Sequence, residues 1–176
     1  MNNLTVKSLG NSGDCLVSGY ASVFGFTDHH NDIVSKGAFS ATSQGNKSIK
    51  FLWQHDAKTP IGRIEKAYED SYGFKIEATI TSGTEKGREA IDLVSKGIIK
   101  GLSIGFNVIN SHINEKGLRV ITELDLWEVS LVTFPANSKS EISNNNVIKS
   151  SLYKALKEAE LQLIKINKRR QNVRHN

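Results

Sequence analysis

Residues 102–135 read LSIGFNVINSHINEKGLRVITELDLWEVSLVTFP, and this stretch decides the fold class. Apolar and polar residues alternate over 102–109 and again over 118–135, which is typical of β-strands with one buried face. Between them, residues 114–117 read Asn-Glu-Lys-Gly, a composition that favours a turn. The stretch therefore predicts two strands joined by a turn, the repeating unit of an antiparallel sheet.

The strand-and-turn pattern also covers most of the chain before this stretch. Residues 13–26 are rich in β-formers, and residues 49–55 alternate with period two. Residues 62–68 and 73–80 predict a further hairpin. We therefore expect a mostly antiparallel β-body.

One helix is expected after this hairpin. Thr84 can cap its N-terminus, and Gly97 can close its C-terminus. Ile91 and Val94 supply its apolar stripe. The predicted fold class is therefore mainly β with helices.

The composition is that of a globular protein with a core. The chain has 176 residues, enough for one domain, of which 38% are hydrophobic and 23% charged. Cys15 is the only cysteine, which excludes an internal disulfide or a cysteine-based zinc site and suits a reducing compartment. The first residues lack the apolar core of a signal peptide, and no stretch approaches the roughly 18 apolar residues of a membrane span. We therefore expect a protein that is neither exported nor inserted in a membrane.

The net charge of +5 is concentrated in the C-terminal part. Residues 1–138 carry 14 Lys/Arg and 15 Asp/Glu, whereas residues 139–176 carry 9 Lys/Arg and 3 Asp/Glu. An electrostatic partner is therefore expected at the tail, and the body gives no reason to expect nucleic acid.

Composition also divides the chain into a body over 1–138, a polar linker over 139–147 and a basic segment over 148–176. The basic segment predicts an amphipathic helix, because its apolar residues recur every three or four positions. These residues are Ile148, Leu152, Leu156, Ala159, Leu163 and Ile166. Such a helix either docks on a partner or packs on the body, and the sequence leaves both open.

His55 ends the alternating segment 49–55, on the face that carries Phe51 and Trp53. A partly shielded imidazole with a pKa near about 6.5 suits proton transfer at neutral pH. The plainer interpretation is a packed or exposed histidine without a chemical role. His55 is therefore a candidate general base that needs partners.

Ser103 lies on the other predicted strand, between glycines. Alternation directs Leu102 and Ile104 to the core and Ser103 to the opposite face, beside Gly105, where nothing bulky in sequence covers the hydroxyl. A nucleophile needs this access, because the carbonyl carbon must approach to about 3 Å. The plainer interpretation is a serine in a tightly packed strand.

Glu128 stands in a mostly apolar strand, alternating with Leu124, Leu126 and Val132. A carboxylate on such a face is costly to bury unless it is paired, and a histidine that needs orienting is one partner. A salt bridge to a lysine is the alternative. Asp125 falls on the opposite face, so alternation favours Glu128 as the third member of a catalytic set.

Two other motifs carry less weight. Residues 101–105 match the G-x-S-x-G elbow of α/β-hydrolases, but here the helix precedes the serine, and the downstream His112 and His175 are poorly placed. Residues 28–32, Asp-His-His-Asn-Asp, suggest a metal site, but adjacent loop histidines rarely converge on one ion. We therefore expect neither a metal nor a cofactor.

Five short motifs follow one another over about residues 15–138. They are GYASVF at 19–24, NDIV with GAF at 31–39, LWQHD at 52–56, GLSIGF at 101–106 and EVSLVTFPAN at 128–137. In these motifs and their order, the sequence resembles the prohead proteases of tailed phages, distant relatives of the herpesvirus assemblin proteases. Each motif alone is weak, whereas five in register are specific.

The resemblance implies a closed antiparallel β-barrel of the herpesvirus-protease type, followed by the C-terminal amphipathic helix. It implies that Ser103 is the nucleophile of a serine endopeptidase and His55 its base. Glu128 falls where the assemblin relatives carry a second histidine, so Asp125 stays open as the third member.

The resemblance further implies an oxyanion hole in the loop that follows the third catalytic residue. Pro135 has no N–H, so Ala136 or Asn137 would donate. The implied substrates are the major capsid protein, a scaffold protein and the protease itself, cut inside the procapsid in the host cytoplasm. Self-association into a homo-oligomer is left open.

Two other classes of protein compete with this interpretation. A non-catalytic capsid-assembly module would keep the barrel and act as scaffold, which the presence of His55, Ser103 and Glu128 disfavours. A nucleic-acid-binding barrel of the OB type would need a basic body, whereas residues 1–138 are slightly acidic.

Overall fold

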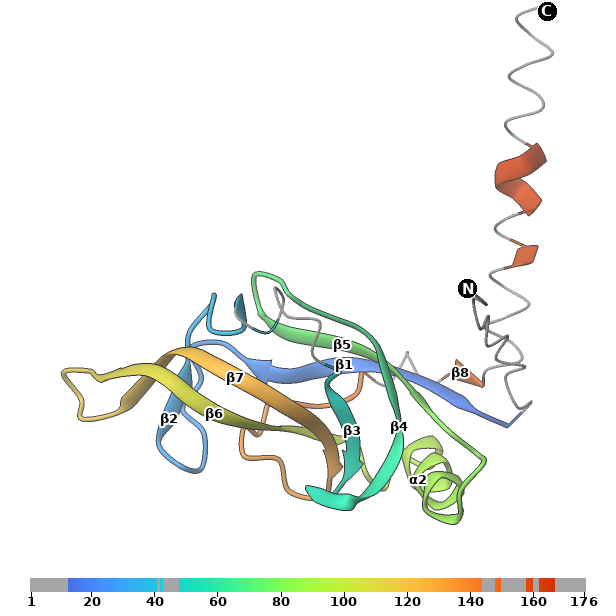
Figure 1. Cartoon of the computed structure of the whole chain (residues 1–176), viewed down its shortest axis with the longest axis horizontal. Helices are drawn as coiled ribbons and strands as arrows, with labels where there is room; N and C mark the ends of the chain where they lie inside the picture. The colour runs from blue at the N-terminus through green and yellow to red at the C-terminus, as the bar shows by residue number, and fades with distance from the viewer. Residues whose placement is uncertain are drawn as a thin grey trace, which may run out of the picture.

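The computed structural model describes residues 13–40, 42, 48–143, 148–149, 158–159 and 162–166. Within these residues the chain forms one eight-stranded sheet and one longer helix (Figure 1). In chain order the elements are β1 (Cys15–Val23), β2 (Asp32–Val34), β3 (Lys50–Trp53), β4 (Asp56–Glu69), β5 (Gly73–Ile80), α2 (Glu85–Ser95), β6 (Gly101–Ile113), β7 (Arg119–Val132) and β8 (Ile148–Lys149).

The sheet is mixed and curls into a half-barrel (Figure 1). Its strand order is β2-β7-β3-β4-β5-β1-β8, and β6 also pairs with β7. The predicted mainly β fold is confirmed, but a closed antiparallel barrel is not what the structure has. Strands β2 and β3 both run parallel to β7, and among the described strands β1 and β6 share no ladder. Alternation in sequence reports which face of a strand is buried, and it says nothing about the direction of the neighbouring strand.

Residues 140–143 bridge the space between β1 and β6. Ile142 pairs with Gly19 of β1, and Glu141 pairs with Gly101 of β6, each as an isolated bridge. Backbone hydrogen bonds of 2.8–3.2 Å connect the segment to both sides, and Ile142 is buried. The first part of the predicted linker 139–147 thus packs against the body.

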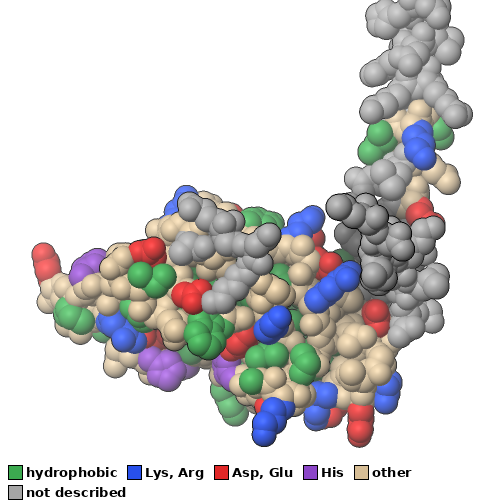
Figure 2. All heavy atoms as spheres, viewed as in Figure 1, with side chains coloured by type: hydrophobic (Ala, Val, Ile, Leu, Met, Phe, Trp, Pro, Cys, Tyr) green, Lys and Arg blue, Asp and Glu red, His purple; other side chains and the backbone are tan. Residues whose placement is uncertain are grey.

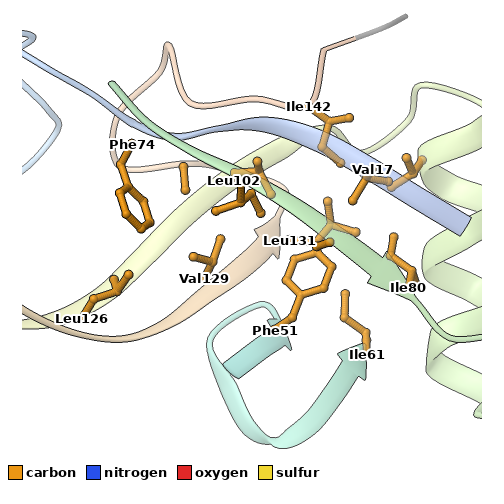
Figure 3. Close-up of a cluster of buried hydrophobic side chains, with 14 of the residues drawn as sticks. Val17, Phe51, Ile61, Phe74, Ile80, Leu102, Leu126, Val129, Leu131 and Ile142 are labelled. Carbon is orange, nitrogen blue, oxygen red and sulfur yellow. The ribbon is translucent and has the colours of Figure 1, made fainter. Parts of the chain in front are cut away.

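The concave side of the curled sheet holds the hydrophobic core (Figure 3). Phe39 and Phe74 stack with ring centroids 4.0 Å apart. The other large buried side chains come from six strands and from the bridging segment: Val17, Phe51, Ile61, Ile80, Leu102, Leu126, Val129, Leu131 and Ile142. Every strand from β3 to β7 is therefore anchored by burial of one face.

The predicted helix and hairpins are confirmed. Thr84 caps α2 by accepting a 3.0 Å hydrogen bond from the Gly87 N–H, and Gly97 follows the helix with a φ of 68°. The predicted turn at 114–117 joins β6 to β7, and the turn after residue 69 joins β4 to β5. Local turn and cap chemistry therefore decided these elements.

Little of the predicted C-terminal helix over 148–176 is among the described residues. Ile148–Lys149, its predicted first residues, instead form β8, which pairs with the start of β1. The unpaired backbone groups at the edge of β1 account for this pairing. Residues 158–159 and 162–166 are helical, and the rest of the prediction lies outside the described residues.

The surface gives no sign of a basic patch on the face seen in Figure 2. Lysine, arginine, aspartate and glutamate side chains are interspersed there over the body. Among the described residues, no helix is long and apolar enough to cross a membrane.

The close approach of residues 140–143 to β1 generates a prediction about Gly19. A Cβ at Gly19 would lie 2.7 Å from the Cα of Ile142 and closer still to the Glu141 carbonyl. Both neighbours are backbone, so Gly19→Ala should lower the free energy of unfolding by about 1–3 kcal/mol in a denaturant titration. Ser18→Ala, which adds no atom, is the control and should change it by less than about 0.5 kcal/mol. Equal stability of the two variants would contradict the proposed packing.

Candidate active site

Two neighbouring strands bring the candidate nucleophile and acid onto one face of the sheet. Ser103 on β6 pairs with Ser130 on β7, and Gly105 pairs with Glu128. Residues directly opposite in an antiparallel pair share a face, as do residues two apart along a strand. All four therefore lie on the same face, next to one another.

A β-bulge in β7 at Trp127 sets the direction of Glu128. The register of β6 with β7 shifts there, with one extra residue in β7. Leu126 and Val129 both belong to the core although they are three residues apart, which regular alternation would not allow. The prediction that Glu128 shares the face of Leu126 is therefore wrong, because the bulge turns Glu128 to the face of Ser103.

His55 lies in the two-residue turn between β3 and β4. Trp53 pairs with Asp56, and the residues between them, Gln54 and His55, have φ of 51° and 61°. Positive φ at both central positions is the mark of a type I′ hairpin turn, which normally takes Asn and Gly. The predicted place of His55, within the strand on the face of Phe51, is therefore wrong. A non-glycine residue at such φ costs about 1–2 kcal/mol, and strain of this kind concentrates at functional sites.

Four hydrogen bonds hold this turn on residues 130–133, at the end of β7 and directly after it. Gln54 donates from its backbone N–H to the Leu131 carbonyl at 3.0 Å. Its side-chain amide donates to the Thr133 hydroxyl at 2.8 Å and accepts from the Thr133 N–H at 3.2 Å. The His55 N–H donates to the Ser130 hydroxyl at 3.1 Å. These bonds offset the backbone strain and fix His55 in place.

His55 and Glu128 form a close pair. The Nδ1 of His55 lies 2.6 Å from Oε1 of Glu128, whose side chain is largely buried, whereas the imidazole is half-exposed. The hydrogen bond to this carboxylate raises the pKa of His55 above its usual value, and the carboxylate charge adds to the rise, while partial burial opposes it. A carboxylate only accepts, so Nδ1 carries the proton of the neutral ring, and Nε2 then keeps its lone pair. Asp125 instead accepts a hydrogen bond from the Trp127 indole.

Gly105 provides the space that the Glu128 carboxylate occupies. A Cβ at Gly105 would lie 2.9 Å from both Cγ and Cδ of Glu128 and closer still to Oε1. The Glu128 side chain therefore passes over Gly105, its partner in the β6–β7 ladder, to reach His55. Any side chain at position 105 would block this path, so only a glycine permits it.

His55 and Ser103 line the same cavity, which has a volume of about 560 Å³. Ser103 is only 5% exposed, so it is less open than the sequence predicted and is reached through this cavity. Ser130, its ladder partner, is fully buried and is not part of the lining. Among the described residues no hydrogen bond joins His55 to Ser103, a bond that is often absent in enzymes without substrate. The walls come mainly from residues 26–34 and 134–137.

The family model of the Caudovirus prohead serine protease matches residues 2–158. The chain belongs to this family.

Relatives of this chain occur in several phages. It is 29% identical over 143 residues to the "Prohead protease" of Enterobacteria phage HK97, covering 78% of this chain and 63% of that one. It is 32% identical over 126 residues to the "Capsid polyprotein" of Pseudomonas phage PAJU2, covering 66% of this chain and 18% of that one. The chain thus spans less than two thirds of the length of these curated relatives.

A solved structure shares the fold of this family member. KSHV protease in complex with a hexapeptide phosphonate inhibitor aligns with a TM-score of 0.51 at 11% identity, covering 73% of this chain and 64% of that chain. The fold is therefore herpesvirus-protease-like.

The loop predicted to form the oxyanion hole lies in the wall of the cavity, with Ala136 and Asn137 in its lining. The Asn137 side chain donates to the Val23 carbonyl at 3.0 Å, and the Ala136 carbonyl accepts from the His29 N–H at 3.0 Å. These bonds hold the loop against the end of β1 and against residues 28–32. No acceptor for the backbone N–H of Ala136 or Asn137 is found in the described part of the chain.

Residues 28–32 form another wall of this cavity. One oxygen of Asp28 accepts hydrogen bonds from the N–H of His30 and of Asp32, at 2.8 and 2.9 Å. Asp32 in turn forms a two-pronged ion pair with Arg119. Among the described residues, no group of three or more His, Cys, Asp or Glu side chains is arranged to hold a metal ion.

The sequence did not point to Ser130 or Gln54 in this candidate site. Ser130 donates to Oε2 of Glu128 at 2.6 Å, and Gln54 anchors the turn that carries His55. One signal was available for Ser130, since it follows Glu128 by two residues and so shares its face. The role of Gln54 depends on a tertiary contact with β7, which no local pattern reports.

The contact between Gly105 and Glu128 yields a prediction. Gly105→Ala should displace the carboxylate from His55, because the new Cβ would clash with the Glu128 side chain. The pKa of His55 should then fall toward its ordinary value, measured by NMR titration of the histidine rings. The melting temperature should fall as well while the protein stays folded, since the displaced carboxylate is largely buried and loses hydrogen bonds. Ser111→Ala, exposed on the same strand, is the control. An unchanged pKa of His55 in Gly105→Ala would refute the assigned contact.

Proposed function

We propose that this chain is a serine endopeptidase that acts in phage prohead maturation, with Ser103 as nucleophile, His55 as general base and Glu128 as the orienting acid. The observation that carries the proposal is the 2.6 Å contact of His55 with Glu128 at the edge of a cavity that Ser103 also lines. Membership of the prohead protease family supports it.

The chemistry follows from the arrangement of these three side chains. The Ser103 hydroxyl attacks a peptide carbonyl at the cavity, and the free Nε2 of His55 takes its proton. Glu128 holds the ring by Nδ1 and stabilises the positive charge that the ring gains. The proton on Nε2 then passes to the departing amine, and water repeats the sequence on the acyl-enzyme.

The oxyanion of the tetrahedral intermediate needs donors in the same cavity. The backbone N–H groups of Ala136 and Asn137 are our candidates, because the loop lines the cavity beside Ser103. Hydrogen bonds to Val23 and His29 hold this loop, so its N–H groups would be in place before the substrate binds.

The proposed substrates are the major capsid protein, a scaffold protein and the protease itself, cut inside the procapsid in the host cytoplasm. Support comes from the names of the relatives, one a prohead protease and one a capsid polyprotein. We further propose that the basic segment predicted over 148–176 docks on an assembly partner through the part that follows Ile148–Lys149, since these two residues pair with β1 of the body. The positive charge of residues 139–176 suits an acidic segment of such a partner.

Replacing the nucleophile gives the first test. Ser103→Ala should lower the rate of capsid-protein cleavage about a thousandfold or more, because no other group can form the acyl-enzyme. The melting curve should stay close to that of the wild type, since only one oxygen is lost beside a cavity. Cleavage would be followed on gels with purified precursor protein. Normal cleavage by a folded Ser103→Ala protein would end the proposal, and a purely scaffolding role would then be favoured.

The pH dependence of cleavage gives a second test. Neutral His55 is the active form, so the rate should rise with pH, with a midpoint above about 6.5 because Glu128 raises the pKa of His55. Glu128→Gln removes the charge that favours the imidazolium, so the midpoint should move down, and kcat should fall by about 10²–10⁴-fold.

Asp125→Asn is the matched control for this second test, because its side chain contacts Trp127. It should leave both the midpoint and kcat close to wild type. The reverse pattern, a mild Glu128→Gln and a severe Asp125→Asn, would move the third role to Asp125.

A further inference from the structure

Ser130 lies in β7 between the two strands that position the other candidate residues. It pairs with Ser103 of β6 on one side and with Leu52 of β3 on the other. Its side chain is fully buried. Directly opposed residues in an antiparallel pair have Cβ atoms about 4.5–5.5 Å apart, so Ser130 is a close neighbour of the nucleophile.

The hydroxyl of Ser130 makes two hydrogen bonds of different kinds. It donates to Oε2 of Glu128 at 2.6 Å and accepts from the backbone N–H of His55 at 3.1 Å. The single hydroxyl thus connects the acid to the backbone of the residue that the acid orients.

The bond to Oε2 restricts the orientation of the carboxylate. Oε1 of Glu128 contacts Nδ1 of His55, and Oε2 is held by Ser130, so both oxygens have a partner. Rotation of the carboxylate about its last bond would break both contacts together. Charge-assisted hydrogen bonds of this length are among the stronger ones in proteins.

The bond from the His55 N–H restricts the strained turn. His55 has a φ of 61°, a conformation that an L-residue leaves readily unless its surroundings hold it. Leu131 and Thr133 anchor Gln54, the preceding residue of the turn, whereas Ser130 binds His55 itself.

We propose that Ser130 is a positioning residue of the active site, which holds the Glu128 carboxylate and the His55 backbone in the one relative arrangement that directs Nε2 toward Ser103. This role rests on the proposed protease function. The competing explanation is a buried strand serine whose hydroxyl serves stability only.

The test replaces Ser130 in the full chain by Ala and by Cys. Cysteine nearly matches the volume of serine but is a weak donor and acceptor, so Ser130→Cys keeps the packing if Ser130→Ala fails to fold. Ser140→Ala is the control, because Ser140 is equally buried and its hydroxyl has no hydrogen-bond partner among the described residues. Each protein is assayed for kcat and KM with capsid precursor, after titration of active molecules with a fluorophosphonate.

The expected result is a fall in kcat per active molecule of about tenfold to a hundredfold, with KM within about twofold, because Ser130 does not line the cavity. The pKa of His55, followed by NMR, should drop toward its ordinary value as the carboxylate loses its second anchor. Ser140→Ala should match the wild type in both readouts.

A merely structural role gives a different pattern. Ser130→Ala and Ser130→Cys would then lower the melting temperature and the number of active molecules, while kcat per active molecule and the pKa of His55 stay at wild-type values. That result would overturn the proposal for Ser130. A wild-type protein without any cleavage would instead count against the protease function, and the pKa of His55 would still decide whether Ser130 holds the pair.

Discussion

The backbone pairing of β7 with β3 along one edge and with β6 along the other brings the candidate site together. Strand β3 ends in the turn that carries His55, β6 carries Ser103, and β7 carries Glu128 between them. Three segments that are far apart in sequence thus meet at one level of the sheet. Burial of the opposite face of these strands in the core holds the arrangement in register, because a slip by one residue would turn every side chain over.

Two local departures from regular β-structure orient the candidate catalytic side chains on these paired strands. The bulge at Trp127 turns Glu128 out of the core, and Gly105 leaves the space through which its carboxylate reaches His55. The tight turn at Gln54 and His55 accepts positive φ and projects the imidazole beside the cavity. The positive φ of the turn costs stability locally, and hydrogen bonds of the turn with Ser130 and Thr133 offset that cost.

The sequence predicted the elements that local chemistry decides. The cap at Thr84, the turn at 114–117 and the β-rich character follow from residue types and period, and the structure has them. The alternation of apolar and polar residues also predicts that Ser103 faces away from the core, unlike its neighbour Leu102. What it could not provide is long-range: the parallel direction of β3, the bulge that changes the phase of β7, and the position of His55 outside its strand. The sequence favoured Glu128 over Asp125 as the neighbour of His55, and the structure has this contact. Its cause is the bulge at Trp127, however, and not the regular alternation on which the prediction was based.

Activation of the Ser103 hydroxyl by the His55–Glu128 pair can be measured by treating the protein with a fluorophosphonate and locating the adduct by mass spectrometry of its peptides. One adduct is expected, on Ser103, formed by the wild type and nearly lost in His55→Ala, because only an activated serine reacts rapidly with such a reagent. An adduct on Ser130 or another serine, or equal labelling of Ser103 when His55 is absent, would contradict this activation.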